Sequence, residues 1–311
     1  MMNELDQNAV YRAYGLNIQS ALELPLMLPG KDKPDVIIDY GTVPDNLPDA
    51  KGKGVCFQAT KGKVLLSVPN IAKYLILNGD TIIIERQPET DDDSVRLFLL
   101  GSAMGALLHQ RGLLVLHANA IVVDSGAVLF MGESGVGKST TAAAFNQKGY
   151  PIAADDICAI DVNAEQPMLY PGFPQVKLWA DACEKLGQDS AGLQRIRPQL
   201  EKYGLPLGEQ FWSEPLPVKR LYILNTINTK EFFLEVLSGA EKFMALGNQT
   251  YRLNFMQSMG LDGSHLRQCT KVAARVPLLC VTRPSGWFLL TELVELISQD
   301  LRESEMVSSS T

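Results

Sequence analysis

Short runs of alternating hydrophobic and polar positions fill the first 90 residues, and this period of two predicts β-strands with one buried face. Strands are expected over residues 10–19, 35–40 and 63–68 and as a pair within 74–86. The pair flanks Asn78-Gly79-Asp80, a turn sequence between two runs of β-branched and aromatic residues, which predicts a hairpin. We therefore interpret the first 90 residues as a smaller β-rich N-terminal domain.

The pattern changes after the polar segment 89–94. Over residues 94–110 the apolar residues recur at spacings of three and four, which predicts a helix. We place a domain boundary near residue 90 and expect a second domain over residues 91–303. The N-terminal domain is a candidate for capturing the substrate, and the serine-rich tail over 304–311 is expected to be disordered.

The second domain opens with the periodicity of an α/β protein. Apolar strands are expected over 113–123 and 127–131, a helix over 140–148 and a further strand over 150–154. Strand, loop, helix, strand is the unit from which a parallel α/β core is built. Later strands are expected over 219–225, 232–236 and 277–282, and later helices over 238–246, 261–274 and 286–301. The fold class that follows is α/β.

A glycine-rich segment joins the second apolar strand to the helix, with the sequence Gly132-Glu133-Ser134-Gly135-Val136-Gly137-Lys138-Ser139. It fits the pattern G-x-x-x-x-G-K-[ST] without a mismatch. Glycines let successive backbone N–H groups turn inward around a phosphate, and the following helix adds its positive N-terminal end. Lys138 supplies a cation for the β- and γ-phosphates, and the Ser139 hydroxyl is a ligand for Mg²⁺. We expect ATP and Mg²⁺ here, with nucleotide contacts from Gly132, Ser134, Gly135, Val136, Gly137, Lys138, Ser139 and Thr140.

Two carboxylates follow that helix closely. Asp155 and Asp156 come at the end of the strand expected over 150–154, and ligands of α/β sheets bind at such strand ends. One carboxylate can hold Mg²⁺ or its water, and the other can accept a proton from an attacking hydroxyl. A lone pair of aspartates more often begins a solvated loop, but its position just after the phosphate-loop helix favours the functional interpretation.

Polar residues also interrupt the first apolar strand. His117 and Asn119 share a face of this strand because they are two residues apart. A polar side chain in such a run either finds a partner in the core or faces a cleft. His117 is thus either a satisfied core histidine or a residue near the γ-phosphate, and both interpretations stay open. Lys177 and Arg283, each in or at the end of a strand, are weaker candidates for binding phosphate or carboxylate, with an ordinary surface role equally open for Lys177.

Composition and charge narrow the range of partners. The 311 residues are 46% hydrophobic and 20% charged, with a net charge of −7, which is typical of a folded protein and argues against a general nucleic-acid binder. The five cysteines form no C-x-x-C pair and are expected to be free thiols. No apolar run reaches about 18 residues, and the acidic first residues do not resemble a signal peptide. We expect a cytoplasmic protein with no nucleic-acid or membrane partner.

The order of these features resembles the catalytic domain of HPr kinase/phosphorylase, a bacterial serine kinase whose P-loop fold is related to phosphoenolpyruvate carboxykinase. The resemblance covers about residues 110–180 and rests on the strand with His117, the loop G-E-S-G-V-G-K-S-T and the acidic pair. It implies a P-loop kinase core with an active site built from His117, Lys138, Ser139, Asp155 and Asp156.

The resemblance also implies a role for each of these residues. Asp156 is the implied general base, with His117 and Lys138 as its catalytic partners. Ser139 and Asp155 are the implied metal ligands. The implied reaction is transfer of phosphate from ATP to a serine hydroxyl.

Two departures from HPr kinases indicate a different acceptor. Thr140 follows the loop serine in place of a glutamate, and the E-x-R-G-x-G stretch is replaced by Pro-Gly-Phe-Pro-Gln-Val-Lys-Leu-Trp at 171–179. This stretch and the β-rich N-terminal part resemble HPr-kinase-like proteins encoded with lasso-peptide and other peptide-modifying clusters. Members of that group phosphorylate the C-terminal serine of a ribosomal precursor peptide.

The sequence thus favours an ATP-dependent kinase that acts on a serine hydroxyl of a peptide or small protein. The alternatives are an HPr-type protein kinase, a small-molecule kinase, and a nucleotide-sensing ATPase module. HPr kinases are hexamers, but the departures above prevent carrying this state over, and the sequence leaves a homo-oligomer open as a partner.

Overall fold

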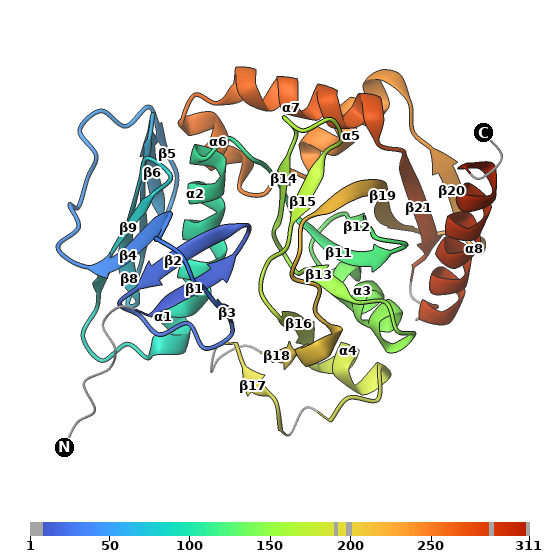
Figure 1. The fold of residues 1–311 in the computed structure, drawn as a ribbon, viewed down its shortest axis with the longest axis horizontal. Coiled ribbons are helices and arrows are strands. Elements are labelled where there is room, and N and C mark those ends of the chain that lie inside the picture. Colours follow the sequence, from blue (N-terminus) through green and yellow to red (C-terminus); the bar gives the residue numbers. More distant parts are fainter. Residues whose placement is uncertain (1–8, 190–191, 197–200, 286–288, 309–311) are drawn as a thin grey trace.

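The computed structural model describes residues 9–189, 192–196, 201–285 and 289–308. Within these residues the chain forms a mixed α/β structure with two nine-stranded sheets and one three-stranded sheet (Figure 1). The α/β class expected from the sequence is confirmed at this level. Of the described helices, none combines the length and the apolar character needed to cross a membrane.

The first sheet contains strands β1 to β9 in the order β3-β1-β2-β4-β9-β8-β7-β6-β5. Its strands are β1 (Val10–Ala13), β2 (Leu16–Ser20), β3 (Leu28–Pro29), β4 (Val36–Tyr40), β5 (Gly52–Lys53), β6 (Phe57–Thr60), β7 (Lys63–Val68), β8 (Ala72–Leu77) and β9 (Thr81–Arg86). The expected strand over 10–19 is instead a hairpin, because Tyr14 and Gly15 adopt φ of 55° and 71° and reverse the chain. The hairpin expected at Asn78-Gly79-Asp80 joins β8 and β9 as an antiparallel pair.

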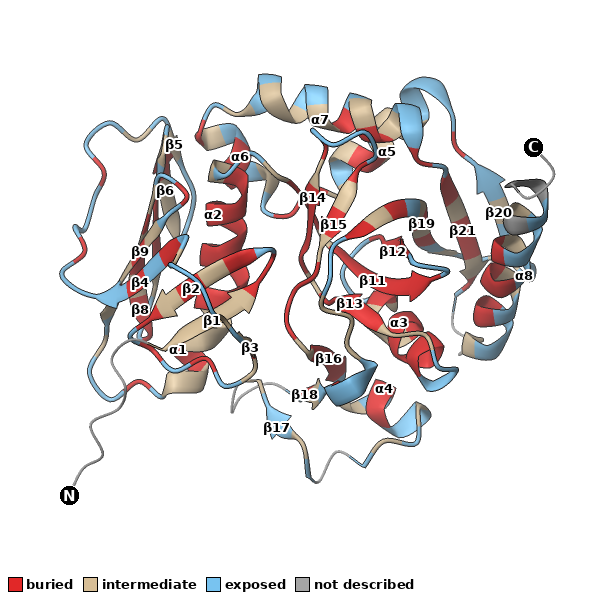
Figure 2. Ribbon diagram, viewed as in Figure 1, coloured by how far each residue is buried: buried red, intermediate tan, exposed pale blue. Residues whose placement is uncertain are grey.

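A helical layer packs against the first sheet. It consists of α1 (Asp92–Phe98), a π-helical turn (Leu99–Ala103) and α2 (Met104–Gln110), where the sequence predicted one helix over 94–110. Residues of all three segments share one hydrophobic core with the first sheet, and α2 is buried along nearly its whole length (Figure 2). The helix assigned to the second domain is therefore integrated with the N-terminal sheet, and the division at residue 90 stays a prediction.

The second sheet carries the glycine-rich loop. Its strands are β10 (Leu114–Leu116), β11 (Ala118–Val123), β12 (Gly126–Met131), β13 (Ile152–Ala154), β14 (Cys158–Asp161), β15 (Met168–Tyr170), β19 (Leu216–Ile227), β20 (Phe233–Val236) and β21 (Leu278–Pro284). The helix α3 (Lys138–Gln147) leads from β12 to β13. These two strands are not neighbours, because β11 lies between them and is antiparallel to both. The second sheet is therefore mixed: β12, β19 and β21 pair in parallel, as the strand, loop, helix, strand unit suggests, and the other named strands of this sheet pair antiparallel.

The remaining elements surround this sheet. A three-stranded sheet has the order β16-β18-β17, with β16 (Gln175–Trp179), β17 (Gln194–Arg195) and β18 (Lys202–Pro206). The other helices are α4 (Ala180–Lys185), α5 (Gly239–Asn248), α6 (Leu253–Ser258), α7 (Asp262–Arg275) and α8 (Leu290–Ser308). Of the tail expected to be disordered, residues 304–308 belong to α8, because hydrogen bonds such as Gln299 to Glu303 support its last turns. Residues 286–288, the expected start of this helix, and 309–311 lie outside the described residues.

A buried histidine ties α2 to the segment that precedes α6 and makes the stability depend on pH. His109 is buried, and its Nε2 lies 2.8 Å from the Tyr251 carbonyl oxygen. Burial lowers the pKa of His109 from 6.5 to about 4. Because the unfolded chain takes up this proton first, the stabilising contribution is complete above pH 6.5 and is lost as the pH falls to about 4.

This loss amounts to about 2 kcal/mol between pH 6.5 and pH 5. We therefore expect the free energy of unfolding in urea to fall by about that much more for the wild type than for His109→Gln over this interval. Parallel pH profiles for the two proteins would contradict the assignment.

Candidate active site

The glycine-rich loop at residues 132–137 connects β12 to α3. Gly132 and Gly137 adopt φ of 135° and 104°, in the region that side chains avoid. A Cβ atom at Gly132 would lie 2.5 Å from the carbonyl oxygen of Leu224 in β19, so only glycine fits beside this strand. Gly137 is the N-cap of α3, which places the positive end of the helix at the loop.

Lys138 lies folded over the loop. Its Nζ donates hydrogen bonds to the carbonyl oxygens of Gly132 at 2.8 Å and Glu133 at 3.0 Å. The residue is buried, and burial lowers the pKa of the ammonium group while Asp156 opposes that shift. The ammonium group is therefore held at the glycine-rich loop by two carbonyl oxygens, and Lys138 lines the cleft.

Asp155 is the centre of a buried polar network. Its Oδ1 accepts hydrogen bonds from the Ser139 hydroxyl at 3.1 Å and from Asn119 Nδ2, and its Oδ2 accepts from the Lys177 backbone N–H at 2.9 Å. Burial raises the pKa of Asp155, against the opposing charge of Lys177. The acidic residue, the loop serine and the strand β11 asparagine thus meet at one point, although they come from three separate elements.

Asp156 lies beside Asp155 but has different partners. Its Oδ1 is 3.1 Å from His117 Nδ1, and its Oδ2 is 3.6 Å from Lys177 Nζ. His117 Nδ1 is also 3.1 Å from the Asp156 carbonyl oxygen, and because both partners are acceptors, Nδ1 must carry the hydrogen. Burial raises the pKa of Asp156, but Lys177 and His117 lower it more, and the net pKa lies well below its usual range.

The backbone of Asp156 is itself unusual. Its φ is 74°, in the left-handed region that aspartate tolerates better than most residues other than glycine. This conformation turns the two adjacent carboxylates to different partners, with Asp155 in the buried network and Asp156 in the cleft. Such strained positions occur often at functional sites.

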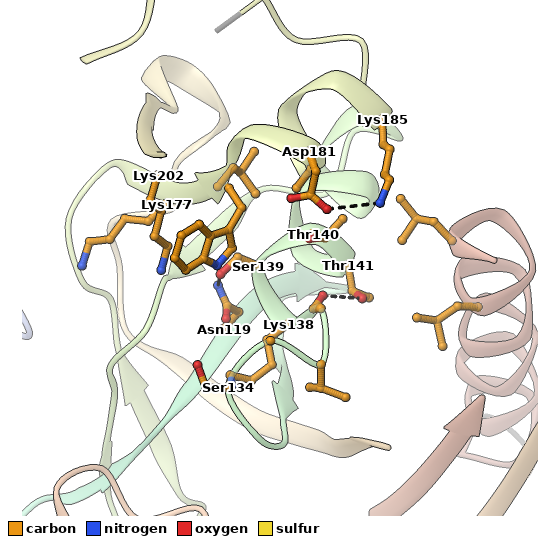
Figure 3. A pocket seen from close by; sticks show the side chains of 18 of the residues that line it. Asn119, Ser134, Lys138, Ser139, Thr140, Thr141, Lys177, Asp181, Lys185 and Lys202 are labelled. Atoms are coloured by element: carbon orange, nitrogen blue, oxygen red, sulfur yellow. Dashed lines mark hydrogen bonds and ion pairs between the residues drawn. The ribbon is translucent and has the colours of Figure 1, made fainter. Parts of the chain in front are cut away.

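Most of the expected site residues line one cleft of about 260 Å³, but Gly132 and Asp155 are not among its lining residues, and Asp155 contacts Ser139 of the lining instead. The lining of the cleft includes His117, Asn119, Ser134, Gly135, Val136, Gly137, Lys138, Ser139, Thr140 and Asp156, together with Lys177 and Arg283. Figure 3 shows Lys138, Ser139 and Asn119 close together at the loop, with Lys177 and Lys202 extending from neighbouring strands. The sequence predicted that His117 lies inside one continuous strand, and this prediction is wrong. The strand β10 ends before His117, and β11 begins after it.

The structure adds residues to the site that the sequence did not assign. Lys202 of β18 lines the cleft and lies 5.6 Å from the ring of Trp179, which also lines it. Gln249 stands behind the loop: its Oε1 accepts from the Gly132 N–H at 2.9 Å and its carbonyl oxygen accepts from the His117 N–H at 2.7 Å. For Trp179, the sequence offered one signal: it lies two residues after Lys177 in β16 and therefore on the same face of the strand. Nothing local marks Lys202 or Gln249.

The donor groups suit Mg²⁺ held jointly with phosphate. Among the described residues, no three His, Cys, Asp or Glu side chains gather in a metal site. Ser139 offers a hydroxyl oxygen and Asp155 a carboxylate oxygen as ligands. Mg²⁺ commonly takes the rest of its ligands from phosphate and water. Asn119 Oδ1 is buried without a partner among the described residues, which leaves one acceptor for a donor that a ligand brings. The side chains of Ser139 and Asp155 are therefore of the types that bind Mg²⁺.

Comparisons with known proteins do not assign the chain to a family. No protein-family model and no curated protein matches it. Among solved structures, the chain is similar to the HPr(Ser) kinase/phosphatase from Coxiella burnetii, with 14% identity and a TM-score of 0.33, over 63% of this chain and 95% of the other. The resemblances to peptide-modifying kinases and to phosphoenolpyruvate carboxykinase stay predictions. What the site can do follows from its own geometry.

Proposed function

We propose that this chain is an ATP-dependent kinase that phosphorylates a serine hydroxyl of a peptide or small protein. One observation carries the proposal: a carboxylate, Asp156, stands in the same cleft as a glycine-rich loop with its lysine and serine. A nucleotide-binding module needs only the loop. A carboxylate in the cleft, positioned by His117 and Lys177, is a group that accepts a proton from an attacking hydroxyl.

In the proposed reaction the serine oxygen forms a bond to the γ-phosphorus of ATP, and the bond to the β–γ bridging oxygen breaks, which releases ADP. The serine proton goes to a carboxylate oxygen of Asp156. The low pKa of Asp156 keeps it ionised at neutral pH, so that it is ready to accept a hydrogen bond from the hydroxyl. Mg²⁺, when bound, neutralises charge on the phosphate oxygens.

The cations of the cleft are arranged for the negative charge of phosphate. Lys138 lies within the loop, while Lys177 and Lys202 extend from one face of the sheet β16-β18. Phosphoryl transfer needs little covalent help from the protein, so that positioning and electrostatic stabilisation supply most of the rate gain. Three lysines lining the same cleft as the Asp156 carboxylate fit that requirement.

For the acceptor, we propose the C-terminal serine of a ribosomal precursor peptide. The support is the P-G-F-P-x-x-K-L-W stretch at 171–179, whose lysine contacts Asp156 in the structure. We further propose ATP and Mg²⁺ as cofactors and a cytoplasmic location, in line with the sequence.

The test is incubation of the purified chain with ATP, Mg²⁺ and a library of peptides that end in serine, followed by mass spectrometry. We expect the mass of one phosphate on the terminal serine. Tight binding of ATP without phosphate on any hydroxyl would overturn the kinase and favour a nucleotide-sensing module.

A further inference from the structure

A second pocket adjoins the candidate active-site cleft and shares one lining residue, Lys177, with it. Its walls include Leu26, Leu97, Leu100 and Phe173, together with Gln175 and Lys177 of β16. Lys177 lines both the cleft and this pocket. The same side chain that contacts Asp156 therefore forms the boundary between the phosphate-binding cleft and an apolar pocket.

One face of the three-stranded sheet connects the two. Successive residues on a strand alternate between faces, so Gln175, Lys177 and Trp179 point to one side of β16. Val176 and Leu178 point to the other side and belong to the core around α3. Opposite Lys177 on β18 stands Gly204, where a Cβ would lie 2.1 Å from the Gln175 side chain, so that the glycine lets Gln175 lie flat on the sheet. Gln175 and Lys177 of this face line the pocket, and Lys177 and Trp179 line the cleft.

The N-terminal part supplies the opposite wall of the pocket. Leu97 belongs to α1, and Leu26 to the segment between β2 and β3. Gln194 of β17 donates to Asp93 of α1 at 2.6 Å, which ties the two walls together. The structure thus gives the N-terminal sheet and its helices a place beside the reacting groups.

Three of the polar side chains that line this pocket satisfy one another. Arg96 donates to Asp93 at 2.7 Å, and Asp93 in turn accepts from Gln194. The Arg96 charge is therefore balanced, and the apolar side chains, which include Ile196, are the part of the lining that suits an apolar ligand. The pocket holds about 50 Å³, which suits the end of one aliphatic side chain.

We propose that this pocket binds an aliphatic side chain of the peptide acceptor, one or two residues from the serine that is phosphorylated. The inference rests on the proposed kinase function and specifies its substrate as a peptide with an aliphatic residue close to the acceptor serine. Lys177 separates the two compartments by a single side chain, so a ligand that presents its hydroxyl to Asp156 reaches the pocket with a neighbouring residue. Burial of one aliphatic side chain gives a preference of about tenfold or more over a polar one.

The test compares two peptides of six residues that end in serine and differ only in the two preceding residues, Leu-Leu against Gln-Gln. Their dissociation constants are measured by calorimetry on the full chain, and phosphate transfer to each is measured in parallel. We expect the Leu-Leu peptide to bind about tenfold more tightly to the wild type. Leu97→Trp and Leu26→Trp fill the pocket from two different elements, and both are expected to bring that ratio close to one.

Leu266→Trp is the matched control, because Leu266 is an exposed leucine of α7 outside the pocket, and it should keep the wild-type ratio. Unchanged ATP binding shows that a variant is folded. Equal dissociation constants for the two peptides on the wild type, including failure of both to bind, would overturn the pocket. So would a ratio that both filling variants leave unchanged. Discrimination in binding without phosphate transfer would support the pocket and overturn the kinase.

Discussion

Asp156→Asn is expected to lower the rate of phosphate transfer by about 10²- to 10⁴-fold, the usual contribution of a positioned general base. Asparagine keeps the size of the side chain and tolerates the left-handed backbone of this position, so the cleft should retain its shape. Nucleotide binding should stay unchanged or become slightly tighter, because one negative charge near the phosphates is removed. The measurements are the single-turnover transfer rate and the dissociation constant of ATP.

Asp124→Asn is the matched control for this substitution. Asp124 also has a positive φ, of 43°, but lies in the exposed turn between β11 and β12. It should transfer phosphate at the wild-type rate. A transfer rate of Asp156→Asn within a few-fold of the wild type would show that another group, or water, accepts the proton.

Lys138→Ala is expected to weaken ATP binding by about 100-fold, or roughly 3 kcal/mol, because a buried charge-assisted contact to phosphate is lost. The loss should fall mainly on ATP and ADP rather than on adenosine, since the lysine lies at the phosphate loop and not at the far end of the cleft. Calorimetric titration with these three ligands measures the effect. Transfer activity should disappear at ATP concentrations that saturate the wild type.

Lys148→Ala provides the comparison within the same helix. Lys148 is the exposed C-cap residue of α3, at the opposite end from the loop, and its removal should leave ATP affinity unaltered. In Lys138→Ala the carbonyl oxygens of Gly132 and Glu133 lose their donor, so the stability of the variant has to be measured as well. Wild-type ATP affinity in a folded Lys138→Ala would refute phosphate binding by this lysine.

The two substitutions together distinguish a kinase from a nucleotide sensor. A kinase loses transfer in Asp156→Asn while binding persists, and loses both in Lys138→Ala. A sensor loses binding in Lys138→Ala but has no step that depends on the carboxylate at position 156. The contrast between the two variants is therefore more informative than either alone.

Local sequence was sufficient where neighbouring residues define the geometry. The glycine-rich loop, its helix and the β8–β9 hairpin lie where their patterns predicted them, because φ preferences and turn residues act over a few positions. The placement of Asp155 and Asp156 directly after β13 follows from the same short-range periodicity. The class α/β follows from summing such local preferences.

Long-range pairing was beyond the local patterns. The antiparallel β11 between β12 and β13 could not be inferred, because strand order depends on which edges meet in the folded chain and not on the strands themselves. The packing of α1 and α2 against the first sheet could not be predicted for the same reason. The apolar face of a helix indicates that the helix packs against another element, but it does not identify that element.

The sequence by itself therefore determined the glycine-rich loop, the acidic pair and the residue types that the site offers, because each depends on residues adjacent in the chain. Only the tertiary structure decided that Asp155 joins Ser139 and Asn119 while Asp156 joins His117 and Lys177. It alone brought Lys202 and Gln249 to the site and placed an apolar pocket behind Lys177. These contacts join segments far apart in sequence, and packing of the whole chain, not local preference, sets them.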